Sequence, residues 1–159
     1  MLKYTLIGAA LVLITVIIHA AGTTWWLGVI GRRHANVDDV FHPDNALKVL
    51  IGTVLILLAL HTLEIVVWAY AYLLLLPPGE LGSFEEAVYF SFVTFTTLGY
   101  GDITLIQNWR LLSGIEALNG IMLVGWTTAM LFAVVQRIWQ GNARQTRGAQ
   151  QESQGESHD

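Results

Sequence analysis

The sequence has no cysteine and only three prolines, and charged residues make up just 13% of its 159 residues. Without cysteine the chain cannot form a disulfide, use a thiolate nucleophile or build a zinc finger, and its redox compartment cannot be inferred. The few basic residues do not gather into a stripe, and the net charge is −4. No nucleic-acid partner is therefore expected. A hydrophobic share of 54% also excludes an ordinary soluble domain.

Because charges are scarce, long apolar blocks remain between them. The first block, Leu2–Ala21, has about the length that a bilayer core requires. A cleaved signal peptide is the alternative, since Lys3 precedes the apolar run and His19-Ala20-Ala21 follows it. Two further blocks span about 46–76 and 109–139. We expect a multi-pass integral protein of the cell (plasma or inner) membrane, with the lipid bilayer as a partner.

The central feature of the chain is the run Thr96-Thr97-Leu98-Gly99-Tyr100-Gly101-Asp102. Its two glycines stand at alternate positions, where the backbone can take left-handed conformations at little steric cost. A segment of alternating handedness can turn all its carbonyls the same way. Four copies around an axis would stack rings of carbonyl oxygens, with the Thr97 hydroxyl adding another ring below. Such rings replace the hydration shell of a potassium ion, as is established for potassium channels.

The run TTLGYGD resembles the filter signature of potassium channels, usually written TTVGYGD, and Phe84–Thr96 resembles the pore helix before it. The similarity covers about Ala46–Gln140 and corresponds to the two-helix pore module of that superfamily. Leu98 replaces the commonest valine but keeps an apolar side chain. The resemblance implies an all-α membrane protein with a potassium-channel pore fold: outer helix, pore helix, filter loop and inner helix. The first apolar block adds one N-terminal transmembrane helix.

The resemblance also assigns residues to the filter and its surroundings. The selectivity filter would comprise Thr97, Leu98, Gly99, Tyr100 and Gly101, with potassium bound at Thr97, Leu98, Gly99 and Tyr100. The residues expected to support the filter are Thr96, Asp102, Tyr89 and Phe90. Potassium is the transported species, so no cofactor and no small-molecule substrate are expected.

The segment before the filter predicts a short helix. Ser83 and Glu86 form an S-x-x-E capping box, and Phe84–Thr96 is too short to span a membrane. The C-terminal end of such a helix carries partial negative charge and would favour a cation in the ion path. Tyr89 and Phe90, where family members often carry two tryptophans, are predicted to buttress Tyr100. We also expect the Tyr89 hydroxyl to reach Asp102.

The sequence divides into three parts. Residues 1–45 would hold the N-terminal transmembrane helix and a cytoplasmic linker from Gly22 to Asn45. Residues 46–140 would form the pore domain, whose outer helix is capped by Asn45 and ended by Pro77-Pro78-Gly79. Residues 141–159, rich in Gln, Gly, Ser and Arg, predict a disordered cytoplasmic tail.

The basic residues indicate an orientation. Six of the eight lie in or beside the linker or at the C-terminal end: Arg32, Arg33, Lys48, Arg137, Arg144 and Arg147. Only Lys3 and Arg110 fall on the opposite side. By the positive-inside rule, the linker and tail lie in the cytoplasm.

Polar residues and glycines inside the apolar blocks suggest further roles. His61 and Glu64 lie one turn apart on the outer helix, as do Glu116 and Asn119 on the inner helix. We expect a buried polar cluster between these helices, which either locks helix packing by hydrogen bonds or senses protons. Gly120, about midway along the inner helix, is either a gating hinge or a close-packing site.

Together these observations predict a homotetrameric, potassium-selective channel for passive conduction, rather than an enzyme. The alternatives are a weakly selective cation channel, if Leu98 loosens the filter, and a non-conducting subunit of a heteromeric channel. A membrane hydrolase using His61 and Glu64 is disfavoured because the sequence has no G-x-S-x-G, no H-E-x-x-H and no paired carboxylates with a clear nucleophile.

Overall fold

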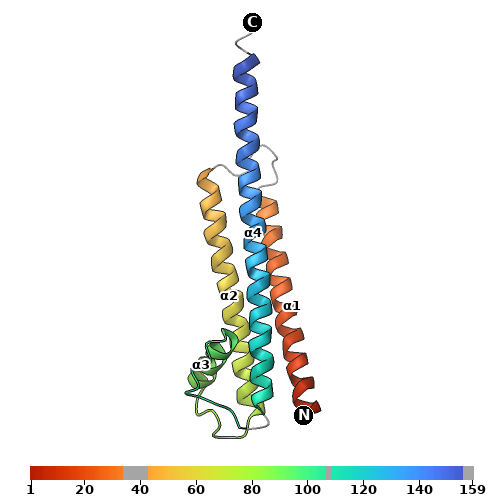
Figure 1. Cartoon of the computed structure of the whole chain (residues 1–159), viewed down its shortest axis with the longest axis vertical. Coiled ribbons are helices and arrows are strands. Elements are labelled where there is room, and N and C mark those ends of the chain that lie inside the picture. Colours follow the sequence, from red (N-terminus) through yellow and green to blue (C-terminus); the bar gives the residue numbers. More distant parts are fainter. Residues whose placement is uncertain (34–42, 107–108, 156–159) are drawn as a thin grey trace. The chain divides into compact units, whose positions relative to one another are not determined.

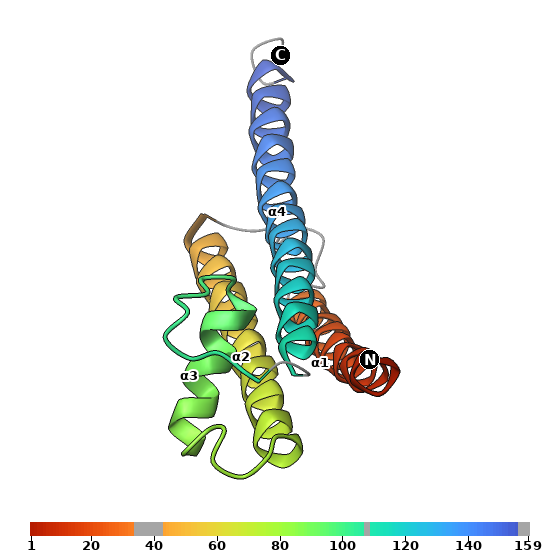
Figure 2. The same ribbon diagram turned by 60° about the horizontal axis from the view of Figure 1, so that its bottom comes forward.

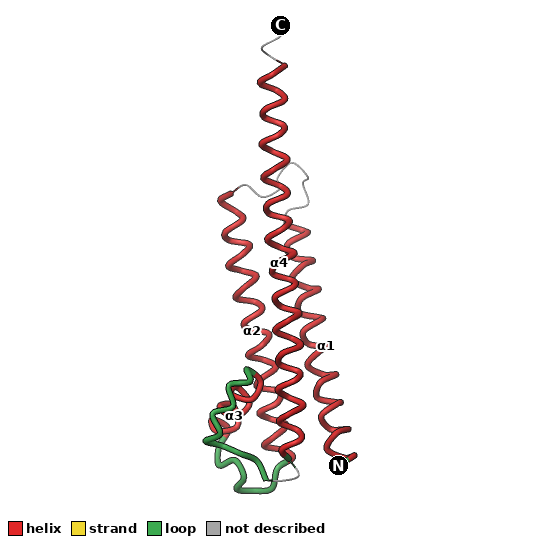
Figure 3. Tube along the Cα trace, in the orientation of Figure 1, coloured by secondary structure: helices red, strands yellow, loops and turns green. Residues whose placement is uncertain are grey.

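The computed structural model describes residues 1–33, 43–106 and 109–155, and these residues form helices joined by loops (Figure 1). The helices are α1 (Leu2–Arg33), α2 (Pro43–Leu75), α3 (Phe84–Phe95) and α4 (Arg110–Gly155). Within the described residues, three segments are long and apolar enough to cross a membrane: Leu2–Arg32, Ala46–Leu75 and Arg110–Trp139. The short α3 is flanked on both sides by loop segments (Figure 3).

Two helix boundaries differ from the sequence-based expectation. Helix α1 does not end at Ala21 but continues to Arg33, so the first half of the predicted linker is helical. Residues 34–42 of that linker lie outside the described residues. Helix α2 starts at Pro43, not after an Asn45 cap. Proline suits the first turn of a helix because its fixed φ is already helical and its missing N–H has no helical partner there.

Helix α3 starts and ends as its sequence indicates. The Ser83 side chain accepts a hydrogen bond from the Glu86 backbone N–H at 3.1 Å. The Glu86 carboxylate in turn accepts from the Gly82 N–H at 2.6 Å. In a standard capping box it would accept from the N–H of the N-cap residue, here Ser83. At the other end, the C-cap Thr96 donates its backbone N–H to the Phe92 carbonyl. These bonds satisfy groups that a helix of only 12 residues would otherwise leave unpaired at its termini.

Helix α4 continues to Gly155, into the stretch from Gly141 for which the composition predicts disorder, and that disorder stays a prediction. Alanine, arginine and glutamine are good helix formers, and no proline interrupts this stretch. A segment that extends an existing helix also avoids the cost of nucleating a new one. Polar composition alone therefore did not predict where the helix ends.

The first compact unit comprises residues 1–23 and 57–127 and contains the run Thr96–Asp102, which we call the filter run. Its core includes Trp68, Tyr72, Phe95, Leu112 and Leu123, all nearly inaccessible to solvent. Helix α3 lies along the C-terminal half of α2 (Figures 1 and 2), where ring pairs of the two helices meet at centroid distances of 5.0 and 5.1 Å. These pairs are Tyr70–Phe84 and Tyr72–Phe90. The packing fixes α3, and with it the start of the filter run.

The second compact unit comprises residues 24–56 and 128–159. Its buried apolar residues are Val49, Val134 and Ile138, with Ile30 and Ala46 packed against them. The Trp26 indole N–H donates to the Thr53 hydroxyl at 3.0 Å. This bond joins α1 to α2 and satisfies a polar group that would be costly to leave unpaired in a membrane.

Candidate functional site

The backbone of the filter run alternates in handedness. Thr97, Gly99 and Gly101 have φ values of 61°, 52° and 78°, whereas the described residues with positive φ do not include Leu98 or Tyr100. The left-handed conformation expected at the two glycines is therefore present, and Thr97 shares it. Positive φ is uncommon for a non-glycine residue and marks a backbone that its surroundings hold in place.

Hydrogen bonds from the end of α3 hold this backbone. The Thr97 N–H donates to the Thr94 carbonyl at 2.9 Å, and the Gly99 N–H donates to the Val93 carbonyl at 3.3 Å. The Thr96 hydroxyl bonds to the Phe92 carbonyl at 2.7 Å. Thr96 thus closes the last turn of the helix, and the chain leaves α3 directly into its left-handed residues.

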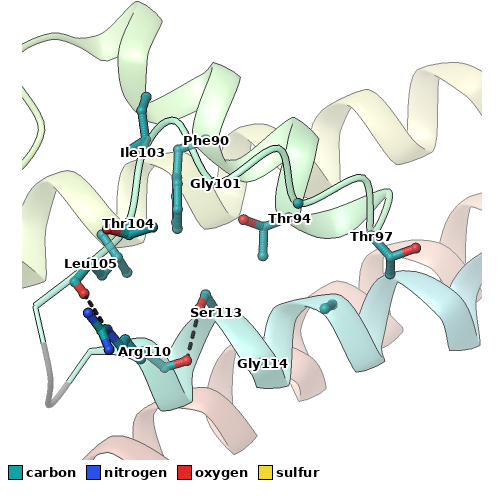
Figure 4. A pocket seen from close by; sticks show the side chains of 12 residues that line it. Phe90, Thr94, Thr97, Gly101, Ile103, Thr104, Leu105, Arg110, Ser113 and Gly114 are labelled. Carbon is teal, nitrogen blue, oxygen red and sulfur yellow. Dashed lines mark hydrogen bonds between the residues drawn. The ribbon is translucent and has the colours of Figure 1, made fainter.

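The side chains of the filter run point away from the core of their own chain. Leu98 is 55% exposed and Tyr100 is 68% exposed, although both are large and the first is wholly apolar. A pocket of about 620 Å³ lies between the filter run and the first turns of α4 (Figure 4). Thr94, Thr97 and Ser113 are among its lining residues. A single chain therefore leaves the filter run open on both sides.

Asp102, the last residue of the run, is anchored to α3. The Tyr89 hydroxyl donates to the Asp102 carboxylate at 2.7 Å, which is the contact expected from the sequence. This hydrogen bond lowers the pKa of Asp102 below its usual value and raises the pKa of Tyr89 above its own. Phe90 is buried and pairs with Tyr72. Its expected role behind Tyr100 stays a prediction.

Acidic residues surround the same end of the first unit, and two of them also hold loops in place. Glu80 accepts a hydrogen bond from the Ile106 N–H at 2.7 Å, across 26 residues of sequence. Glu86 bonds to the backbone at the start of α3. The Arg110 side chain donates to the Leu105 carbonyl at 3.0 Å (Figure 4). The first bond joins the loop before α3 to the loop after the filter run, and the other two tie these loops to the first turns of α3 and α4.

A comparison with protein families identifies the fold to which this geometry belongs. A family model described as "Ion channel" matches residues 56–137, which is more than half of the chain. The chain belongs to this ion channel family. The match begins within α2 and ends within α4, so it includes α3 and the filter run. Searches of curated proteins and of solved structures returned no match.

With its long apolar helices, this member of the ion channel family is a multi-pass integral membrane protein. The polar cluster expected between α2 and α4 is divided into separate groups in the structure. Glu116 does not meet Glu64 or His61. It bonds instead to Tyr72 of α2 and Ser91 of α3, while Asn119 bonds to α1. The prediction of one joint cluster is wrong because α1 and α3 also supply polar partners.

The Glu116 network links the three elements around the filter run. The Tyr72 hydroxyl donates to one carboxyl oxygen of Glu116 at 2.6 Å, and Ser91 Oγ lies 2.5 Å from the other. Ser91 Oγ also lies 2.9 Å from the Ile65 carbonyl oxygen. Glu116 and Ser91 are both fully buried. A serine hydroxyl has a single hydrogen, so it cannot donate to Glu116 and to Ile65 at once.

The hydrogens of this network are all placed if Glu116 carries a proton. Its Oε1–H then donates to Ser91, whose own hydrogen goes to the Ile65 carbonyl, while Oε2 accepts from Tyr72. Every contact has one donor and one acceptor in this arrangement, and no net charge is buried in the membrane. In this arrangement Glu116 of α4 bonds to side chains of α2 and α3, and the Ser91 hydroxyl joins α3 to the backbone of α2.

The second group joins α1, α2 and α4. His19 Nδ1 lies 2.8 Å from one carboxyl oxygen of Glu64, and His61 Nδ1 lies 3.0 Å from the other. The Thr127 hydroxyl lies 2.9 Å from His61 Nε2 and 3.4 Å from His19 Nε2. Sequence reasoning found His61 and Glu64 but missed His19, which it placed at the end of a possible signal peptide. A histidine within an apolar helix was the available signal.

Asn119 forms a third contact with α1, which sequence reasoning also missed. Its side-chain amide donates to the Thr15 hydroxyl at 2.9 Å, and both residues are buried. The neighbouring Gly120 touches the end of α3: a methyl group there would overlap the Phe95 carbonyl oxygen. This contact accounts for the glycine by close packing, while its role as a gating hinge stays a prediction.

Proposed function

We propose that this protein is a potassium-selective channel that conducts passively through a homotetrameric pore. The observation that carries the proposal is the alternating handedness of Thr97, Gly99 and Gly101 within TTLGYGD. This backbone can present consecutive carbonyl oxygens to one side, which is what the dehydration of a potassium ion requires. The filter would bind potassium through the residues from Thr97 to Gly101.

The tetramer is proposed because one chain offers only one side of such a filter. Leu98 and Tyr100 are large side chains that are exposed in the single chain. On a filter loop we expect such side chains to be covered by protein, not by water or lipid. Apolar residues of the α4 surface, among them Ile121 and Met122, are likewise more than half exposed. Contacts with three further copies of the chain would cover these residues and complete the carbonyl rings.

The electrostatics of the proposed pore favour cations. Helix α3 ends at Phe95, so the partial negative charge of its C-terminus lies next to the filter run. No lysine or arginine stands between Pro77 and Trp109, whereas that stretch holds Glu80, Glu85, Glu86 and Asp102. An acidic mouth concentrates cations before they enter a pore.

The decisive experiment measures currents of the purified chain in a planar bilayer. With potassium on one side and sodium on the other, the reversal potential should lie far from zero, at a voltage that opposes potassium flow toward the sodium side. A reversal potential near zero with clear current would instead identify a weakly selective cation channel. Absence of current from a verified homotetramer would favour a non-conducting subunit and overturn the proposal.

A further inference from the structure

His19, His61 and Glu64 bring together the ligand types of a transition-metal site in the first unit. Their candidate ligand atoms all lie within 4.8 Å of one another. His19 and Glu64 are fully buried, and His61 is 15% exposed. We propose that this cluster, which we call the His19–His61–Glu64 site, binds a divalent transition ion of the Zn²⁺ class.

The orientation of the two imidazole rings fits this proposal. Both rings direct Nδ1 toward Glu64 and Nε2 toward the Thr127 hydroxyl. Histidines that bind metals almost always use their second ring nitrogen for a hydrogen bond that fixes the ring. Here one threonine oxygen, with two lone pairs, can accept that bond from both rings. The two Nδ1 atoms are then free to bind an ion beside the carboxylate.

The hydrogen count gives a second reason. With Glu64 ionised and both rings neutral, each Nδ1–H donates to the carboxylate and both Nε2 atoms need a hydrogen. The Thr127 hydroxyl can supply only one, so the buried His19 Nε2, at 3.4 Å, is left poorly satisfied. An ion on the Nδ1 side moves each ring hydrogen to Nε2, and both then donate to Thr127. The neutral rings neither gain nor lose a proton in this exchange.

The ligand chemistry selects the class of ion. Two imidazole nitrogens and one carboxylate suit zinc and its neighbours, whereas calcium and magnesium prefer oxygen ligands throughout. In a tetrahedral zinc site, ligand atoms about 2.0–2.2 Å from the metal lie about 3.3 Å from one another. The two Nδ1 atoms lie 2.8 and 3.0 Å from different oxygens of the Glu64 carboxylate. Binding one ion would lengthen these separations slightly and bring together those ligand atoms that are up to 4.8 Å apart. Water would fill the fourth position, at the exposed edge of His61.

The test uses the untagged, full-length chain in detergent, with Zn²⁺ as the probe and isothermal titration calorimetry as the measurement. The background variant carries His34→Gln, His42→Gln and His158→Gln, which removes every histidine outside the site. We expect it to bind one Zn²⁺ per chain. Single replacement of His19, His61 or Glu64 by Gln should weaken binding by more than about 100-fold. Thr127→Val, which removes only the hydroxyl beside the two Nε2 atoms, should weaken it about 10-fold.

X-ray absorption at the zinc edge tests the same site in the background variant without altering any ligand. Two nitrogen and two oxygen ligands at about 2.0–2.2 Å would support the site. Failure of the background variant to bind Zn²⁺, binding that survives the ligand replacements, or an all-oxygen shell would overturn it. Glu64 and the histidines would then form only a hydrogen-bonded brace. Because neither measurement uses current, the result is independent of the proposed potassium selectivity.

Discussion

The filter run and the Glu116 network lie in the same compact unit but differ in the burial of their side chains. In the filter run the side chains of Leu98 and Tyr100 are exposed. The Glu116 network is fully buried, and each of its oxygen atoms has a partner within the chain. The first region exposes the side chains that the proposed tetramer would cover. The second is complete within one chain, as expected because an unpaired polar group in a membrane is costly.

Of the substitutions in these two regions, we expect Gly99→Ala to have the largest effect on the channel current. A Cβ there strains a residue with φ of 52°, although it would meet no atom within 4 Å. We expect Gly99→Ala to abolish potassium selectivity or current while the chain still inserts and assembles, because only the filter backbone is affected. The measurement is the reversal potential of reconstituted protein.

The matched control is Gly31→Ala, since Gly31 is helical and a methyl group there also has open space. It should conduct as the wild type does. Selectivity retained in Gly99→Ala would contradict the proposed role of the left-handed filter backbone.

A second prediction concerns the completeness of the buried network. Glu116→Leu leaves the Tyr72 hydroxyl without an acceptor, and an unsatisfied buried group costs about 1–3 kcal/mol. The variant should therefore lower the free energy of unfolding and the midpoint of thermal dissociation. Glu116→Gln should retain most of the stability, because an amide can donate to Ser91 and accept from Tyr72 as a neutral carboxyl does.

Thermal unfolding of both variants in detergent provides the measurement. If Glu116→Gln proved as destabilising as Glu116→Leu, an ionised carboxylate rather than a neutral group would hold the network.

A third prediction concerns the contact of α4 with the end of α3, which lies next to the filter run. Gly120→Ala places a methyl group on the Phe95 carbonyl and should destabilise the fold by about 1–3 kcal/mol through overpacking. Gly125→Ala is the control, because nothing lies within 4 Å of its added methyl group. Equal unfolding midpoints for the two variants would argue against close packing at Gly120.

The smallest effect is expected from Tyr89→Phe, which removes the exposed hydrogen bond to Asp102. Currents should persist, but they should decline faster during prolonged opening because the last residue of the filter run loses its bond to α3. Because the pKa of Asp102 is lowered, the bond's contribution is present above the usual aspartate value of 3.8 and is lost as pH falls through the lowered pKa. The pKa of Tyr89 is raised, so the contribution is also lost as pH rises through that value, above the usual 10.0.

The difference between wild type and Tyr89→Phe should therefore stay constant from mild acid to mild alkali. A difference in the rate of current decline that vanished near pH 6 would show that another group controls this contact.

The sequence by itself determined the features that depend on neighbouring residues. The glycines of the filter run, the capping box at Ser83 and the length of the apolar blocks are local, so they predicted the left-handed backbone, the start of α3 and the membrane spans. The contact of Tyr89 with Asp102 was also predicted, from the resemblance to the pore helix of potassium channels, and the structure contains it. In each case the chain has few alternatives over so short a distance.

Tertiary structure alone decided which polar residues meet. Glu64 bonds to a histidine 45 residues away, and Asn119 bonds to a threonine 104 residues away. A one-turn spacing showed that His61 and Glu64 share a helix face, but it carried no information about the rotation of α1 against that face. Packing sets that rotation, because each buried polar group must find a partner among the helices around it. The single cluster expected between α2 and α4 is therefore several separate groups, and α1 or α3 supplies a partner to each of them.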